Sequence, residues 1–287
     1  MPADLMNAVS SDVMLGLAQA GGAIVLCAAV VALCGWFSVH VEREAAISIL
    51  RGLVQMVAVG MVLAALLSAA LWVGALILVA MMVAAAFTAA RRLQGMSGAL
   101  PLCFCAIAAG AGVVIAAMLA TGTLKSDIAM LVPVGSMVIG NAMNACAQAA
   151  ERFRADVASH VGEVEASLAL GADPAVAVAP QVKNAVYASL LPRLDTLKSL
   201  GLVWIPGIMA GMMVSGASPI YAGIYQFIII AMILAASGIT GLTVVLLART
   251  RAFSPAAQLT WRRTEVGDTM RRYPPANRNR LRLQNTA

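Results

Sequence analysis

The longest uncharged stretch of this chain runs from Ser199 to Ala248 and reads SLGLVWIPGIMAGMMVSGASPIYAGIYQFIIIAMILAASGITGLTVVLLA. These 50 residues contain no Asp, Glu, Lys or Arg. A helix needs roughly 20 apolar residues to cross the hydrocarbon core of a membrane. The stretch is therefore long enough for two spans, with a turn predicted in the Gly- and Pro-containing segment 215–219.

Four further uncharged stretches predict more spans. They cover residues 13–41, 52–90, 93–124 and 128–150, with lengths of 29, 39, 32 and 23 residues. The 39-residue stretch can hold two helices and the others one each. The predicted spans are 13–36, 46–67, 73–91, 99–121, 128–150, 199–217 and 221–248. The in-out alternation of a membrane β-barrel is missing, so we expect an all-α polytopic membrane protein of about seven helices.

The composition agrees with this class. Hydrophobic residues make up 61% of the 287 residues, and charged residues only 11%. A soluble domain normally carries about 25% charged residues. The composition therefore predicts that lipid, rather than water, surrounds most of the chain.

The basic residues predict the orientation. With seven spans and the N-terminus outside, the inner loops and the inner helix ends carry all of the 19 Lys and Arg residues except Lys125. Basic residues concentrate on the cytoplasmic side of membrane proteins. We therefore expect an outer N-terminus, a cytoplasmic C-terminus and a multi-pass protein of the cell membrane.

The chain is predicted to have four parts: spans one to five (1–150), a cytoplasmic helical insert (151–198), spans six and seven (199–248) and a basic tail (249–287). The tail holds nine Arg with little apolar content, which is typical of a disordered segment. Its charge favours anionic lipid headgroups over nucleic acid, because few aromatic residues accompany the Arg residues.

The insert shows a helical pattern. Val157, Val161, Val164 and Leu168 recur at intervals of four, three and four residues, which is one face of a helix. This helix is predicted to end at Gly171, as a C-terminal cap. Asp173 and Pro174 then predict the start of a second helix, which runs to about Leu190 and stops before Pro192.

The chain lacks the motifs of common enzymes. There is no GxxxxGK[ST] phosphate loop, no HExxH and no GxSxG, and the two His residues, His40 and His160, are far apart. We therefore expect neither catalysis nor a cofactor, and the chain cannot bind ATP through a phosphate loop of its own.

Polar side chains inside the spans are the candidates for function. Arg51 and Gln55 are four residues apart in span two, Asn141, Asn144 and Gln148 share a face of span five, and Tyr225 and Gln226 lie in span seven. Such groups line a water-filled pathway or hydrogen-bond between helices. The neighbouring methionines, including Met137 and Met143, are either packing residues or soft metal ligands, and the ligands of a metal stay unknown.

Four motifs in the same order resemble the FetB-type permeases. This family comprises bacterial iron-export permeases of ATP-binding-cassette transporters and plant aluminium-sensitivity permeases. The motifs are Arg51-Gly-Leu-Val-Gln55, Pro133-Val-Gly-Ser-Met-Val-Ile-Gly-Asn-Ala-Met143, Gly201-Leu-Val-Trp-Ile-Pro-Gly-Ile-Met209, and Pro219 followed by Tyr225-Gln226. The resemblance covers about residues 15–250. The chain departs from the family pattern at Ser136, where Gly is usual, and at Trp204, where Ser is usual.

The resemblance implies a permease that pairs with a second copy of itself and with two copies of a separate ATPase. The insert would then couple the ATPase to the spans, through Glu163, Glu165, Gly171, Leu191 and Pro192. The substrate pathway implied by the motifs and the polar residues comprises Arg51, Gln55, Met137, Asn141, Met143, Asn144, Gln148, Tyr225 and Gln226.

The cargo implied by the resemblance is iron or another metal ion for bacterial members, and a nucleotide sugar for plant relatives. Two other classes stay open. A stand-alone channel or secondary transporter needs no ATPase, and a membrane enzyme or scaffold would need a constellation that this sequence lacks.

Overall fold

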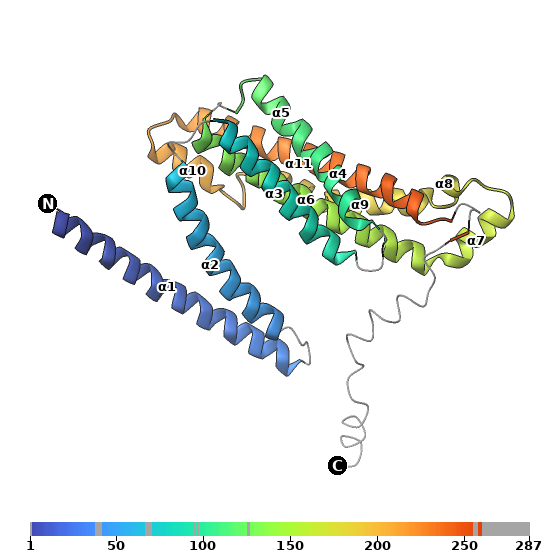
Figure 1. Ribbon diagram of the computed structural model, residues 1–287, viewed down its shortest axis with the longest axis horizontal. Helices are drawn as coiled ribbons and strands as arrows, with labels where there is room; N and C mark the ends of the chain where they lie inside the picture. The colour runs from blue at the N-terminus through green and yellow to red at the C-terminus, as the bar shows by residue number, and fades with distance from the viewer. Residues whose placement is uncertain are drawn as a thin grey trace, which may run out of the picture. The chain divides into compact units, whose positions relative to one another are not determined.

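The computed structural model of the chain is almost entirely helical (Figure 1). It describes residues 2–37, 42–66, 71–93, 96, 98–124, 127–254 and 258–259, with side chains for all of these except 2–13 and 62–66. Within these ranges β-pairing is limited to two isolated bridges. The predicted all-α class is therefore confirmed, and the orientation stays a prediction. Most of the predicted basic tail, including all of 260–287, lies outside the described residues.

The chain divides into two compact units, residues 1–67 with 275–287 and residues 68–274. The first unit contains α1 (Pro2–Trp36) and α2 (Glu42–Leu66), which pack on each other. Each has a window long and apolar enough to cross a membrane, and none of either window is buried. Apolar residues all around such helices suit contact with lipid.

The second unit is a helical bundle built around α6 and α11. Its elements are α3 (Leu71–Arg92), α4 (Ala99–Ile107), η1 (Ala108–Gly112), α5 (Val113–Ala120), α6 (Ile128–Ser159), α7 (Val161–Ala169), α8 (Pro174–Ala177), α9 (Ala179–Ser199), α10 (Gly207–Val214) and α11 (Pro219–Arg251). Helix α6 packs on α3, α9 and α11, and α11 also packs on α4, η1 and α10. The π-helical turn η1 joins α4 and α5 into one helix.

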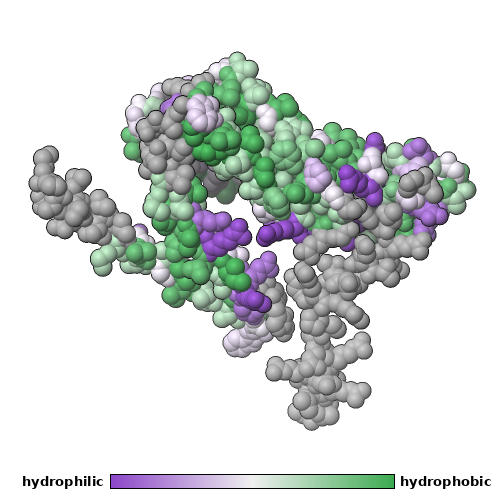
Figure 2. Space-filling view, in the orientation of Figure 1, coloured by the Kyte–Doolittle hydropathy of each residue, from purple (hydrophilic) through white to green (hydrophobic). Residues whose placement is uncertain are grey.

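The middle of this bundle is apolar. Its largest fully buried side chains include Ile107, Met118, Ile139, Phe153 and Ile229, which come from α4, α5, α6 and α11. On the face drawn in Figure 2, the surface over α4 and α5 is mostly hydrophobic, whereas hydrophilic residues gather toward α7. Since α6 has 32 residues and is therefore about 48 Å long, it exceeds a hydrocarbon core of about 30 Å. The whole of α6 therefore does not fit within a hydrocarbon core along the membrane normal.

Six of the described helices are long and apolar enough to span a membrane, compared with about seven predicted. The difference lies in the predicted span 199–217, where the only helix is α10, with 8 residues and a length of about 12 Å. Gly201 has a positive φ of 77°, and Pro206 is extended at φ −71° and ψ 142°. Both conformations interrupt a helix.

Helix α9 leads directly into this interrupted segment from its N-terminal side. It continues through Pro192 to Ser199, so the prediction that it stops before Pro192 is wrong. Proline removes one hydrogen bond from a helix interior, and the packing of α9 along both α6 and α11 outweighs this loss.

Helices α9 and α10 run antiparallel to α11. A Cβ atom on Gly241 would lie 2.8 Å from Ser189 Oγ, one on Gly238 would lie 3.7 Å from Leu190 Cδ2, and one on Gly223 would lie 3.9 Å from Met209 Cε. Residue numbers in α9 and α10 therefore rise as those in α11 fall. We infer that the sixth crossing is a broken helix, formed by the C-terminal half of α9, the break 200–206, and α10.

The turn between α7 and α8 has the predicted caps. Gly171, with φ 87°, donates its N–H to Leu168 O at 3.0 Å, and Ala172 N donates to Ser167 O at 3.1 Å. These two bonds form a Schellman motif. Asp173 Oδ1 accepts a hydrogen bond from Ala175 N at 2.7 Å, as an N-cap requires. The predicted single helix through Val157, Val161, Val164 and Leu168 is wrong, because α6 ends at Ser159 and α7 begins at Val161. Val157 and Val164 are nevertheless both fully buried.

Candidate functional site: a cavity at the break in the sixth crossing

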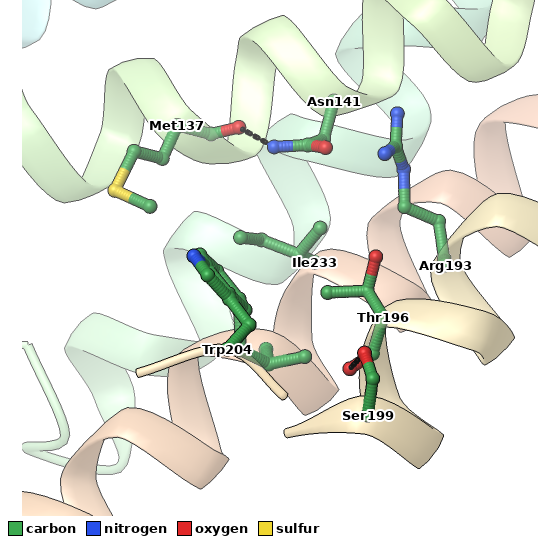
Figure 3. Close-up of a pocket in the computed structure, with 8 residues that line it drawn as sticks. Met137, Asn141, Arg193, Thr196, Ser199, Trp204 and Ile233 are labelled. Atoms are coloured by element: carbon green, nitrogen blue, oxygen red, sulfur yellow. Dashed lines mark hydrogen bonds between the residues drawn. The ribbon is translucent and has the colours of Figure 1, made fainter. Parts of the chain in front are cut away.

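A cavity of about 300 Å³ lies beside the break in the sixth crossing. Its lining comes from α6, α9, the break and α11, and consists of Met137, Asn141, Arg193, Thr196, Ser199, Trp204, Ile230 and Ile233 (Figure 3). Non-helical backbone at membrane depth is tolerated where it is buried in protein or lines a cavity. Part of the backbone of the break is hydrogen-bonded locally, since Gly201 N donates to Trp204 O at 3.1 Å and Val203 N donates to Ser199 O at 3.0 Å.

Helical spacing directs the lining residues to the cavity. Met137 and Asn141 are four residues apart on α6, so both lie on one face of that helix. Arg193, Thr196 and Ser199 are three residues apart on the last turns of α9. The polar part of the lining therefore comes from one face of α6 and one face of α9.

Arg193 is the charged residue of this lining. Its side chain is partly buried, and its Nε atom is fully buried without a hydrogen-bond partner among the described residues. The nearby carboxylate of Asp195 lies 3.5 Å from Lys198 Nζ instead. Figure 3 shows the guanidinium group reaching from α9 on the same side of the cavity as the amide of Asn141.

The neutral polar groups of the lining are hydrogen-bonded to their own helices. Asn141 Nδ2 donates to Met137 O at 2.7 Å, which leaves its second N–H and its Oδ1 atom available. Thr196 Oγ1 donates to Pro192 O at 2.8 Å, and Ser199 Oγ donates to Thr196 O at 3.1 Å. Trp204, which is 42% exposed, adds an aromatic side chain to this lining.

The structure places two of the predicted pathway residues, Met137 and Asn141, at the cavity. The others are not among its lining residues. Met143 and Asn144 are partly exposed on α6, Gln148 is exposed, Tyr225 and Gln226 are buried on α11, and Arg51 and Gln55 are exposed on α2 of the other unit. Both polar atoms of the Gln226 amide are buried without a hydrogen-bond partner among the described residues.

The predicted coupling residues are all exposed. Glu163 and Glu165 lie on α7, Gly171 lies in the turn that follows, and Leu191 and Pro192 lie on α9. Leu191 and Pro192 immediately precede Arg193 in the part of α9 that lines the cavity, whereas Glu163, Glu165 and Gly171 belong to α7 and its following turn.

Sequence reasoning missed Arg193, Thr196 and Ser199 as site residues. The segment 193–198 carries Arg193, Asp195 and Lys198, and these charges assigned it to the cytoplasmic insert. The available signal was the three-residue spacing of the polar residues after Pro192. That spacing becomes informative only when α9 is known to pack beside the middle of α6 and α11.

We expect a cysteine at position 141 to react with a water-soluble thiol reagent, because Asn141 lines the cavity. The measurement is the labelling rate of Asn141→Cys in a chain whose 5 native cysteines have been replaced. Val138→Cys is the matched control, since Val138 lies on the same helix and is fully buried. Equal labelling rates at the two positions would contradict the assignment of Asn141 to an accessible cavity.

Comparison with known proteins places this chain in a family. The model of the family described as "Uncharacterised protein family (UPF0014)" matches residues 17–253. The UPF0014 membrane protein STAR2 of Oryza sativa subsp. japonica is 30% identical over 249 residues, which cover 86% of this chain and 87% of that protein. The protein ALUMINUM SENSITIVE 3 of Arabidopsis thaliana is 29% identical over 245 residues, or 85% of this chain and 90% of that protein.

A bacterial relative is similar over most of its length. The probable iron export permease protein FetB of Escherichia coli is 27% identical over 219 residues, which cover 76% of this chain and 85% of that protein. No solved structure matches the chain. The resemblance to FetB-type permeases seen in the four motifs is thus confirmed. Because the family model and the rice protein both match most of the chain, this chain belongs to the UPF0014 family of membrane proteins.

Proposed function

We propose that this chain is the membrane-spanning permease subunit of an ATP-binding-cassette transporter that exports iron or another metal ion. The observation that carries the proposal is the 27% identity, over 219 residues, to a protein named as a probable iron export permease. Two copies of the chain would pair and bind two copies of a separate ATPase. A separate ATPase is needed because the chain has no phosphate loop of its own.

The docking surface proposed for the ATPase consists of Glu163, Glu165, Leu170 and Val176, on α7, α8 and the turn between them. Leu170 is 90% exposed and Val176 is 64% exposed, and Glu163 and Glu165 are exposed as well. Exposed aliphatic side chains among polar residues favour a protein partner over water. This surface supports docking outside the hydrocarbon core.

The helices next to the docking surface support its use in coupling the ATPase to the cavity. Val164, on the opposite side of α7, is fully buried and belongs to the same core as Val157 of α6. On the other side, α8 leads directly into α9, which ends at the cavity. A displacement of the docking surface would therefore be transmitted to both α6 and the broken crossing.

A secondary transporter is the alternative function, and the broken crossing favours it. Interrupted helices beside a cavity at the middle of the membrane are common in transporters that use ion gradients. Such a protein would work without an ATPase.

The two functions are separated by reconstitution. The chain is placed in proteoliposomes, alone or with the phosphate-loop ATPase encoded nearest to it, and iron kept soluble as a citrate complex is followed across the membrane. We expect iron movement only with the ATPase and ATP, and none when the phosphate-loop lysine of the ATPase is replaced. Iron movement by the chain alone, unchanged by ATP, would instead support the secondary transporter.

A further inference from the structure

The charge of the cavity indicates which kind of molecule it accepts. We propose that the cavity binds an oxyanion, a carboxylate or phosphate group, at Arg193, with Trp204 against the remainder of the ligand. Binding of the oxyanion does not depend on the proposed function. Only the further statement that the bound ligand is transported rests on it. It implies that a transported metal ion would enter as an anionic complex and not as a bare cation.

The depth of Arg193 makes its charge significant. The residue shares the cavity with Ile230 and Ile233, which lie roughly 16 to 21 Å along α11 from its start at Pro219. An ionised side chain near the middle of a membrane is costly, and it normally faces water or pairs with an opposite charge. No ion pair is formed by Arg193 within the described part of the chain. A ligand with a negative charge would supply the missing partner.

The same lining is unsuited to a bare metal cation. Its side chains include no Asp, Glu, His or Cys, and the described residues contain no group of three such residues that could hold a metal ion. Backbone carbonyls at the end of α9 are also occupied, because Leu197 O and Ser199 O accept hydrogen bonds from residues of the break. The remaining neutral ligand atoms, Met137 Sδ, Asn141 Oδ1 and the hydroxyl oxygens of Thr196 and Ser199, would have to hold a cation beside a guanidinium group that repels it.

Arginine suits an oxyanion for geometric reasons. Its planar guanidinium group donates two parallel hydrogen bonds to a carboxylate or phosphate, and this charge-assisted pairing is stronger than a neutral one. The second N–H of Asn141 is available to add a further bond. The hydroxyl groups of Thr196 and Ser199 would join only after leaving the carbonyls that they now contact.

Trp204 gives the cavity an aromatic surface. It lines the cavity with 42% of its own surface exposed. An indole ring offers a large flat apolar surface. The ligand would therefore combine an oxyanion with a planar or apolar part.

Trp204 also provides the test. The chain has 4 tryptophans, so replacing Trp36, Trp72 and Trp261 by phenylalanine leaves Trp204 as the only indole fluorophore. The protein is placed in nanodiscs, without any ATPase, and titrated with citrate, ferric citrate, pyrophosphate and ferrous ion. We expect a saturable change in Trp204 fluorescence with the anions and none with ferrous ion. Whichever of citrate and pyrophosphate binds more tightly identifies the preferred oxyanion.

Substitutions on α9 assign the binding to Arg193. Arg193→Gln should weaken anion binding about tenfold or more, because a charge-assisted hydrogen bond is lost. Arg193→Lys should retain part of the affinity. Lys183→Gln removes the same charge from an exposed position of the same helix and should leave binding unchanged.

Two results would overturn the proposal whatever the variants do to folding. One is binding of triethyl citrate, which has the citrate skeleton without its charge, as tightly as citrate to the protein with native Arg193. The other is a response to ferrous ion alone that exceeds the response to the anions. Anion binding to Arg193→Gln with unchanged affinity would also contradict it. Since no ATPase is present, these outcomes are independent of whether transport is ATP-driven.

Discussion

Replacing Gly110 by alanine is expected to lower the thermal stability of the bundle strongly. Gly110 lies in the π-helical turn η1, where the chain packs directly on α11. An added Cβ atom would lie 2.6 Å from Ala236 O and 2.9 Å from Thr240 N, and it would also overlap Thr240 Oγ1. The first two atoms belong to the backbone and cannot rotate away, so the helices must separate. Such overpacking costs about 1–3 kcal/mol, and more when the backbone is displaced.

Gly112→Ala is the matched control for this prediction. It lies in the same turn, but its added Cβ would meet only Met82 Cε, at 4.0 Å. The measurement is the unfolding midpoint of the purified protein in detergent. The double variant Gly110→Ala with Thr240→Ala should recover little stability, because the carbonyl of Ala236 still obstructs the new methyl group. Equal midpoints for Gly110→Ala and Gly112→Ala would show that α11 does not approach η1 this closely.

The largest effect on transport is expected from the docking surface. Leu170→Asp combined with Val176→Asp places two carboxylates on side chains that are 90% and 64% exposed. In the free subunit these two side chains are already exposed, so folding should be unaffected. In the complex they would be buried without a partner charge, which costs several kcal/mol. We therefore expect loss of ATPase binding and of ATP-driven transport, with normal membrane insertion.

Co-purification with the ATPase and ATP-driven iron movement are the two readouts for this change. Lys183→Asp serves as the control, because it adds a carboxylate at another exposed position of the same insert. Glu165→Arg tests the charged part of the docking surface and should also weaken ATPase binding. The docking surface is wrongly placed if the double variant retains the ATPase at wild-type yield.

The sequence alone predicted those features that depend on neighbours along the chain. The long apolar stretches predicted the helices of the bundle, because a helix in lipid satisfies its own backbone wherever its partners lie. Gly171 and the Asp173–Pro174 pair predicted the turn between α7 and α8 for a similar reason, since a cap involves only residues within about one helical turn. Asn141 was predicted because an amide inside an apolar helix is costly without a cavity or partner.

Only the tertiary structure decided the path of α9 and the place of Arg193. Charges at Arg193, Asp195 and Lys198 ended the apolar stretch, so local hydropathy assigned α9 wholly to the insert. The packing of α9 along α6 and α11 instead brings Arg193 to the same cavity as Asn141, 52 residues earlier in the chain. Whether a charged residue lies in water or within a membrane cavity depends on which distant helices surround it. A hydropathy pattern along the chain does not specify which helices pack together.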